Sequence, residues 1–219
     1  MTLRRLVLWR HGETDHNASR RMQGQLDSVL TALGEAQARR AAPLLAAMRP
    51  DLLLSSDLGR ATATMAPLAE CTGLLVRTDE RLRETHLGQW QGLTHDDVDE
   101  RWPGARQAWR LDAGWSPPGG ENRLQVAARA GAVVAELDAT DATDVIVCTH
   151  GGLIASLVAS LLALPVDNWP ALGGIANCCW VVLERPEPSA PDLDATADVP
   201  SGPGVTGWRL RSYNAGPHP

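Results

Sequence analysis

Polar side chains follow three of the short apolar runs in this sequence, and their types suit the binding of a phosphoryl group. They are Arg10-His11-Gly12, residues 55–60 with Arg60 at the end, and His150-Gly151-Gly152. Arginine side chains bind the oxygens of a phosphate dianion through forked hydrogen bonds. A neutral imidazole within such a set can attack phosphorus and become phosphorylated.

The phosphoryl-transfer chemistry that these residues allow also needs a proton donor. His11 is the candidate nucleophile, and Arg10 and Arg60 would spread the charge of the transferring group. The leaving alkoxide takes a proton, which a carboxylic acid can supply, and the same carboxylate can later accept a proton from the attacking water. Glu84 is the candidate for both roles.

Glycines beside these residues would bring main-chain groups close to the phosphate. Gly12 and Gly151 carry no side chain, so the backbone at each can approach an oxyanion. The helix expected after Gly152 would add the positive end of its dipole. The sequence therefore predicts an anion site that is closed partly by main chain.

Apolar runs and helical periodicity predict the elements that must position these residues. Strands are expected over 6–9, 52–54, 74–76, 144–149, 177–184 and 207–213. Helices are expected over 31–50, 57–71, 94–102 and 121–137, and in the apolar segment after residue 152. This alternation predicts a three-layer α/β/α sandwich with a mostly parallel central sheet. Because ligands of such sheets bind beyond the carboxyl ends of the strands, the three polar groups are expected to converge.

Composition and charge limit the class of protein. Of the 219 residues, 44% are hydrophobic and 21% charged, as in a folded chain, and we expect one domain over 1–219 with a flexible loop at 186–204. A net charge of −6 argues against a nucleic-acid partner. All 20 basic residues are arginine, which excludes Schiff-base and P-loop chemistry that depends on lysine.

The cysteines and the apolar runs predict neither a metal site nor a membrane span. Cys71, Cys148, Cys178 and Cys179 form no C-x-x-C pair, so no metal and no cofactor are expected. No apolar run has the length that crosses a bilayer. With no signal peptide evident at the start, we expect a cytoplasmic protein with reduced thiols.

Four motifs in these regions resemble the signature of the histidine phosphatase superfamily, the phosphoglycerate mutase-like proteins. They are LWRHGET at 8–14, SSDLGRA at 55–61, LRE at 82–84 followed by GQWQG at 88–92, and THGG at 149–152. Their order and spacing match the family from residue 3 to about residue 183. The resemblance implies a phosphoglycerate mutase-like fold and a phosphomonoesterase that works through a phosphohistidine.

The resemblance also implies a role for each matching residue. His11 would be phosphorylated, and Glu84 would donate the proton. Arg10, Arg60 and His150 would hold the phosphoryl group. Four further residues are expected at the substrate: Asn17, Gln23, Gly24 and Gly151.

A finer resemblance within the family concerns the substrate. Over 20–27, 83–94 and 150–174 it implies a small-molecule phosphate ester, namely a phosphorylated sugar or glycerate. The GQWQG segment is typical of the phosphatase branch and argues against a cofactor-dependent phosphoglycerate mutase. A broad-specificity phosphatase stays open as an alternative. A binding module without activity is disfavoured because all five catalytic positions are intact, and a homodimer is the family-level expectation.

The remaining histidines and several tryptophans have plainer explanations. His16 is expected at the entrance, His86 near the substrate and His95 in the first turn of a helix, with none of the three essential. The tryptophans at 90, 102, 109 and 115 could form a wall that stacks on a sugar. Positions in the core and at the rim are more common for such residues.

Overall fold

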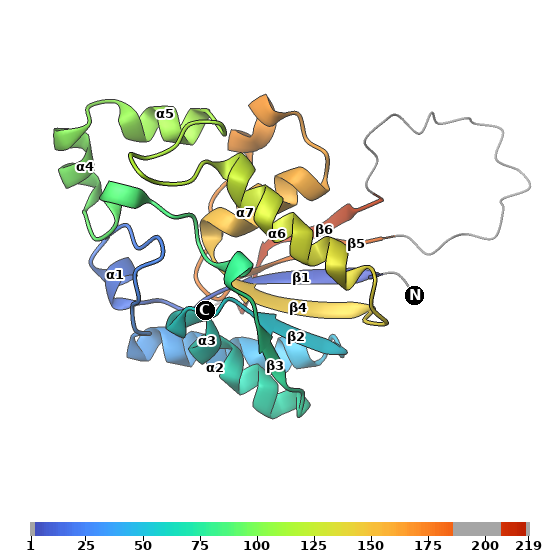
Figure 1. Cartoon of the computed structure of the whole chain (residues 1–219). Coiled ribbons are helices and arrows are strands. Elements are labelled where there is room, and N and C mark those ends of the chain that lie inside the picture. Colours follow the sequence, from blue (N-terminus) through green and yellow to red (C-terminus); the bar gives the residue numbers. More distant parts are fainter. Residues whose placement is uncertain (1–2, 186–206, 218–219) are drawn as a thin grey trace, which may run out of the picture.

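A single sheet runs through the molecule, and helices cover both of its faces (Figure 1). The computed structural model describes residues 3–185 and 207–217. Within them the sheet has the strand order β3-β2-β4-β1-β5-β6. The strands are β1 (Arg5–Arg10), β2 (Leu52–Ser55), β3 (Val76–Thr78), β4 (Asp144–Thr149), β5 (Trp180–Glu184) and β6 (Arg209–Ala215).

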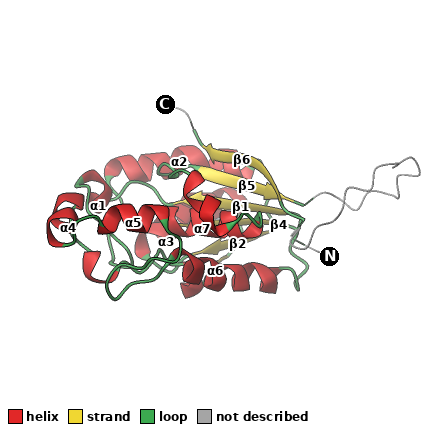
Figure 2. Ribbon diagram, turned by 90° about the horizontal axis from the view of Figure 1, so that it is seen from above, coloured by secondary structure: helices red, strands yellow, loops and turns green. Residues whose placement is uncertain are grey.

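Two pairs of long helices form the outer layers, and shorter helices gather at one end (Figures 1 and 2). One layer holds α2 (Ala32–Ala46) and α3 (Gly59–Thr72), and the other holds α6 (Arg123–Leu137) and α7 (Gly151–Leu161). The short helices are α1 (Asp15–Ala18), α4 (His95–Arg101), α5 (Ala105–Leu111) and the 3₁₀ turns η1 (Glu80–Leu82), η2 (Gly88–Trp90) and η3 (Val166–Ala171).

The alternation of side chains along the strands explains the two layers. In β1, Leu6 and Leu8 pack into the core beneath α6 and α7, whereas Val7 and Trp9 pack into the core against α2 and α3. Successive side chains of a strand point to opposite faces, so a strand that is apolar throughout needs cover on both sides. The predicted three-layer α/β/α sandwich is confirmed.

The strand order places the predicted site residues side by side. β4 lies between β2 and β1 and pairs in parallel with both. Arg10 is level with Thr149, and Ser55 is level with Cys148. The segments that follow these three strands therefore leave the same edge of the sheet. β3 is also parallel to β2. β5 pairs antiparallel with β1, and β6 pairs antiparallel with β5, so the sheet is mostly parallel as expected.

Several element boundaries differ from the prediction. The third strand is Val76–Thr78 rather than 74–76. The helix expected over 31–50 is α2, which ends at Ala46, before Pro50. Helices α1 and α5 were not predicted. Helix α5 has no buried residue, so its sequence lacks the apolar stripe by which helices are recognised. The loop predicted at 186–204 lies outside the described residues. Among the helices of the described ranges, none has the length and apolar character needed to cross a membrane.

Candidate active site

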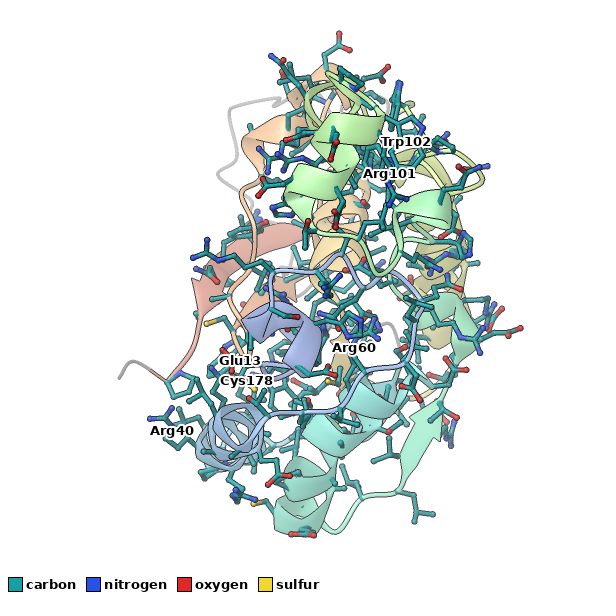
Figure 3. The ribbon with its side chains drawn as sticks, turned by 90° about the vertical axis from the view of Figure 1, so that its left-hand side faces the viewer. Glu13, Arg40, Arg60, Arg101, Trp102 and Cys178 are labelled. Carbon is teal, nitrogen blue, oxygen red and sulfur yellow. The ribbon has the colours of Figure 1, made fainter. Side chains whose placement is uncertain are left out.

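A pocket of ≈ 210 Å³ opens at the carboxyl ends of the central strands. Figure 3 looks onto this end, with Arg60 near the centre and the segment that carries Arg101 and Trp102 above it. Seven of the nine predicted site residues line the pocket: Arg10, His11, Asn17, Gln23, Gly24, Arg60 and Glu84. His150 and Gly151 lie next to this set rather than among the lining residues.

His11 is buried, and its ring has a defined orientation. Its Nδ1 lies 2.8 Å from the carbonyl oxygen of Gly12. Because a carbonyl only accepts, Nδ1 carries the hydrogen and Nε2 keeps its lone pair. Burial, with Arg10 and Arg60 beside the ring, holds the pKa of His11 well below its usual range. The ring is therefore neutral and presents an unprotonated Nε2.

The two arginines predicted to hold the phosphoryl group, Arg10 and Arg60, are anchored by main-chain carbonyls. Arg60 donates from Nη2 to the carbonyl of Gly24 at 2.7 Å and from Nη1 to that of Leu26 at 2.8 Å, and Arg10 donates from Nη1 to Ile175. Burial lowers the pKa of Arg60 to about 10, so it stays charged at neutral pH. The Nε atoms of both arginines are buried and have no hydrogen-bond partner among the residues that the structure describes. Two positive charges are thus fixed where an anion would be stabilised.

His150 packs directly behind His11. The two ring centroids are 5.2 Å apart, and His150 is completely buried. Its Nε2 lies 2.9 Å from the Ser56 hydroxyl, while its Nδ1 has no hydrogen-bond partner within residues 3–185 and 207–217. Burial, together with the charge of Arg60, holds the pKa of His150 well below its usual range. A second neutral imidazole therefore lies against the first.

Glu84 projects into the pocket from the loop after η1, and main-chain groups fix its carboxylate. Oε1 accepts from the N–H groups of Thr85 at 2.8 Å and Leu153 at 3.0 Å, and Oε2 accepts from Gly152 at 3.0 Å. The last two belong to the first turn of α7. The positive end of this helix was predicted to contribute to the anion site, and in the structure its N–H groups at Gly152 and Leu153 hold the Glu84 carboxylate.

The absence of a side chain at Gly152 is necessary for this contact. A Cβ there would lie 2.6 Å from Glu84 Oε1. Gly151 lies beside Arg10, whose Nε would be 3.4 Å from a Cβ at that position. Gly12 has a packing role that the sequence did not reveal. Its N–H donates to Thr64, and a Cβ would lie 2.6 Å from the carbonyl oxygen of Gly34.

The segment between β1 and α2 forms one wall of the pocket. Asn17 closes the capping box of α1, and its Oδ1 also accepts from Asn177 at 3.1 Å. Gln23 is held by the Ser28 hydroxyl, which donates to its Oε1 at 2.7 Å. Gly24 has a φ of 56°, in the left-handed region that favours glycine, and its carbonyl is the acceptor for Arg60.

The pocket also contains residues that the sequence did not single out as essential. They are Arg21, Met22, Thr85, Leu87, His95, Trp109 and Gly152. His95 begins α4 as expected, but it also lines the pocket. Burial and the charges of Arg106 and Arg110 lower its pKa. His16 is partly exposed, and its Nδ1 lies 3.2 Å from Asp15 Oδ1. His86 Nδ1 accepts a hydrogen bond from the Gly88 N–H at 3.3 Å.

The tryptophans form a cluster more than a wall. Trp90 is buried, and its ring packs against three others. The ring centroids of Trp102, Trp109 and Trp115 lie 6.3, 6.0 and 5.4 Å from that of Trp90. Of these four, Trp109 lines the pocket. The stacking wall considered from the sequence is therefore reduced to one ring, which the other rings support. Elsewhere in the pocket, Arg21 and Met22 could have been predicted as lining residues, because they directly precede the predicted residues Gln23 and Gly24 in the sequence.

No group of three or more side chains suited to metal binding occurs within residues 3–185 and 207–217. The charged and polar side chains that line the pocket include three arginines, two imidazoles, one carboxylate and two amides. This set matches an anionic phosphate ester, because its charge balance is positive without an ion.

Comparison with known proteins identifies relatives along nearly the whole chain. The model of the histidine phosphatase superfamily (branch 1) matches residues 6–197. Glucosyl-3-phosphoglycerate phosphatase of Mycobacterium tuberculosis (strain ATCC 25618 / H37Rv) is 51% identical over 224 residues, covering 98% of this chain and 96% of the relative. A solved structure of a mycobacterial glucosyl-3-phosphoglycerate phosphatase complexed with VO3 matches with a TM-score of 0.84 and 52% identity, over 97% of this chain and 99% of that one.

A more distant relative has a different activity in its name. The probable phosphoglycerate mutase of Salmonella paratyphi C (strain RKS4594) is 35% identical over 162 residues, covering 73% of this chain and 75% of the relative.

Proposed function

This chain belongs to the histidine phosphatase superfamily and is a phosphatase, and we propose that it hydrolyses glucosyl-3-phosphoglycerate through a phosphorylated His11. The observation that carries the substrate is the 51% identity to glucosyl-3-phosphoglycerate phosphatase over 98% of the chain. The observation that carries the mechanism is the orientation of His11, whose Nδ1 contacts a carbonyl and whose Nε2 is available.

In the first step His11 Nε2 attacks phosphorus, and the P–O bond to the glyceryl oxygen breaks. The leaving oxygen takes its proton from the carboxyl group of Glu84. Arg10 and Arg60 lie beside the ring and stabilise the charge on the transferring phosphoryl group. Glucosylglycerate leaves, and the phosphoryl group stays on Nε2.

In the second step water attacks phosphorus, and Glu84 takes the proton of that water. The P–N bond breaks, and its electron pair returns to Nε2 of His11, so free enzyme and inorganic phosphate are formed. The same carboxylate acts first as acid and then as base, which restores its starting state after each turnover.

The remaining predicted residues support the phosphoryl group. Ser56 Oγ accepts the N–H of Leu58 at 3.3 Å, so its own hydrogen can be donated to His150 Nε2. Nδ1 of His150 then carries a hydrogen and serves as a donor toward the phosphoryl oxygens. Asn17 supports the phosphoryl group, and Gln23 and Gly24 contact the rest of the substrate. Gly151 keeps the space beside Arg10 open, because it carries no side chain.

The part of the pocket lined by Arg21, His95 and Trp109 suits the rest of this substrate. Arg21 and His95 can donate to the carboxylate and hydroxyl groups of the glycerate, and the Trp109 ring offers an apolar face to a sugar. The Arg123 guanidinium lies 5.5 Å from the centre of that ring. Arg21 and Arg123 thus bring positive charge to this part of the pocket, which suits a substrate with a second anionic group.

We extend the proposal to a cytoplasmic homodimer without cofactor. The four cysteines are free thiols, which suits a reducing compartment. Light scattering coupled to size-exclusion chromatography tests the dimer, and a monomeric mass would contradict it.

The substrate proposal is tested by the rate of phosphate release at steady state. We expect kcat/KM for glucosyl-3-phosphoglycerate to exceed the values for 3-phosphoglycerate and p-nitrophenyl phosphate at least about tenfold, which corresponds to about 1.4 kcal/mol of transition-state binding. Equal values for all three esters would favour a broad-specificity phosphatase. Conversion of 3- to 2-phosphoglycerate at a rate similar to hydrolysis would favour a mutase.

A further inference from the structure

Arg129, on α6, contacts the segment that carries Glu84 at more than one point. Its Nη1 donates to the main-chain carbonyl of Arg81 at 2.6 Å, and its Nη2 donates to that of Glu84 at 3.0 Å. The same guanidinium forms a forked pair with Glu121, from Nε at 2.9 Å and Nη2 at 3.0 Å. Its side chain is 18% exposed, so most of the group is out of water.

Glu121 extends this contact to a third point of the same segment. Its Oε2 accepts from the N–H of His86 at 2.8 Å, and its own N–H donates to the carbonyl of His86. Although burial acts to raise the pKa of Glu121, the bonds from Arg129 and from the His86 N–H hold it below its usual range. The Arg129–Glu121 pair therefore binds the main chain at Arg81, Glu84 and His86.

Both ends of Glu84 are fixed by these contacts. Its carboxylate is held by N–H groups at the start of α7, and its main-chain carbonyl is held by Arg129 and by Gln25 Nε2 at 3.0 Å. A side chain with both ends held has little freedom to move relative to the phosphoryl group. A proton donor loses much of its effect when it is displaced by about 1 Å.

We propose that Arg129, paired with Glu121, is a positioning residue that sets the place of the Glu84 carboxyl group at the leaving oxygen. This inference rests on the proposed role of Glu84 as proton donor. Arginine is needed because its planar fork supplies several donors in fixed directions, whereas a lysine ammonium is a single point.

Holding α6 in place does not require this pair. The helix buries an apolar face that is part of the core, made by Val126, Ala130, Val133, Val134 and Leu137. A second arginine pair also joins α6 to the same loop, because Arg81 forms a fork with Glu136 at 2.6 and 2.7 Å. The Arg81 side chain bonds to Glu136 and to Asp79, whereas Arg129 bonds to the Glu84 carbonyl, so Arg81 provides a matched control.

The test compares esters that differ in their need for an acid. p-Nitrophenolate leaves as a stable anion, whereas the alkoxide of glucosyl-3-phosphoglycerate or 3-phosphoglycerate must be protonated as it leaves. We expect Arg129→Met to lower kcat/KM for the alkyl esters by about 10- to 100-fold and that for p-nitrophenyl phosphate by less than about threefold. Arg81→Met should change both by less than about twofold, since its pair lies at the surface.

Arg129→Lys separates the effect of the positive charge from that of the forked hydrogen bonds. It keeps the charge but loses the fork, so most of the selective loss of kcat/KM on the alkyl esters should remain. This variant also serves if Arg129→Met does not fold. Full recovery with lysine would show that charge alone matters and would overturn the proposal. An equal loss on both classes of ester would also overturn it, because it would indicate general structural damage.

Glu84→Gln is the reference for the proposed function itself. It should show the same selectivity with a larger loss, about 10²- to 10⁴-fold on the alkyl esters. If Glu84→Gln shows no such selectivity, the role of Glu84 fails and the inference about Arg129 fails with it. If Glu84→Gln is selective and the Arg129 variants are not, only the inference fails.

Discussion

The inner end of the pocket and its rim are built in different ways. At the inner end, Arg10 is the last residue of β1, and His11 and His150 directly follow β1 and β4. Their side chains are held by main-chain carbonyls or by a neighbouring hydroxyl. At the rim, His95 and Trp109 come from the short helices α4 and α5, outside the sheet. The sheet thus positions the group that reacts, and the separate segments position what surrounds the rest of the substrate.

This difference separates chemistry from substrate choice. A change at the inner end should lower the rate for every phosphate ester, because all of them share the phosphoryl group. A change at the rim should affect only those esters that extend to it. Substitutions at the two ends should therefore have distinguishable effects on kcat/KM across a set of substrates.

The largest effect is expected at His11. His11→Ala should lower kcat for both glucosyl-3-phosphoglycerate and p-nitrophenyl phosphate by about 10⁴-fold or more, since no other group can form the intermediate. The wild type quenched with labelled substrate should carry an acid-labile, alkali-stable phosphoryl group, which the variant should lack.

The control for this experiment is His11→Asn. Its amide can still donate to the Gly12 carbonyl, so the hydrogen bond of Nδ1 is retained while Nε2 is removed. We expect cooperative unfolding near the wild-type midpoint and the same loss of activity. A rate close to that of the wild type in either variant would falsify the phosphohistidine mechanism.

The inner end was largely predictable from the sequence, and the physical reason is local. Arg10 ends a buried strand, and His11 and His150 immediately follow buried strands, so the strand order brings them together. Arg60 and Glu84 were found from motifs. The attachment of Glu84 to the first turn of α7 was not predictable, because it joins residues 68 and 69 positions apart that no local pattern relates.

The rim was predicted only in part. The helix expected over 94–102 is α4, whereas α5 was missed, because it buries no residue and so lacks the apolar periodicity of a core helix. The tryptophans were noted, but the sequence did not indicate that Trp109 alone of the four would line the pocket while Trp90 fills the interior. Side chains on such segments are placed by long-range packing.

The second prediction concerns stability at acid pH. His11 and His150 have pKa values well below the ordinary value of 6.5 in the folded protein, so the unfolded chain binds more protons as the pH falls below that value. Stability is therefore fully present above about pH 6.5 and is lost toward the folded pKa. Each histidine should contribute up to about 1.4 kcal/mol per pH unit to this slope.

Urea unfolding between pH 7.5 and 5 measures this slope for the wild type and two variants. His150→Asn should reduce the slope by about 1.4 kcal/mol per pH unit. His95→Asn, at the exposed rim, should change it less, although burial and nearby arginines lower the pKa of His95 as well. A slope unchanged in His150→Asn would show that this ring is not kept neutral by burial.

The smallest effect is expected at the rim itself. His95→Ala should lower kcat/KM for glucosyl-3-phosphoglycerate by about fivefold, or about 1 kcal/mol, because one donor to the non-reacting part of the substrate is lost. The value for p-nitrophenyl phosphate should stay within about twofold, since this ester has no carboxylate or sugar for the rim to bind. Asp96→Ala, the next residue of α4 and not part of the pocket, is the matched control. An equal loss on both esters would mean that the rim acts on the chemistry at the inner end, and the separation of the two regions would then be wrong.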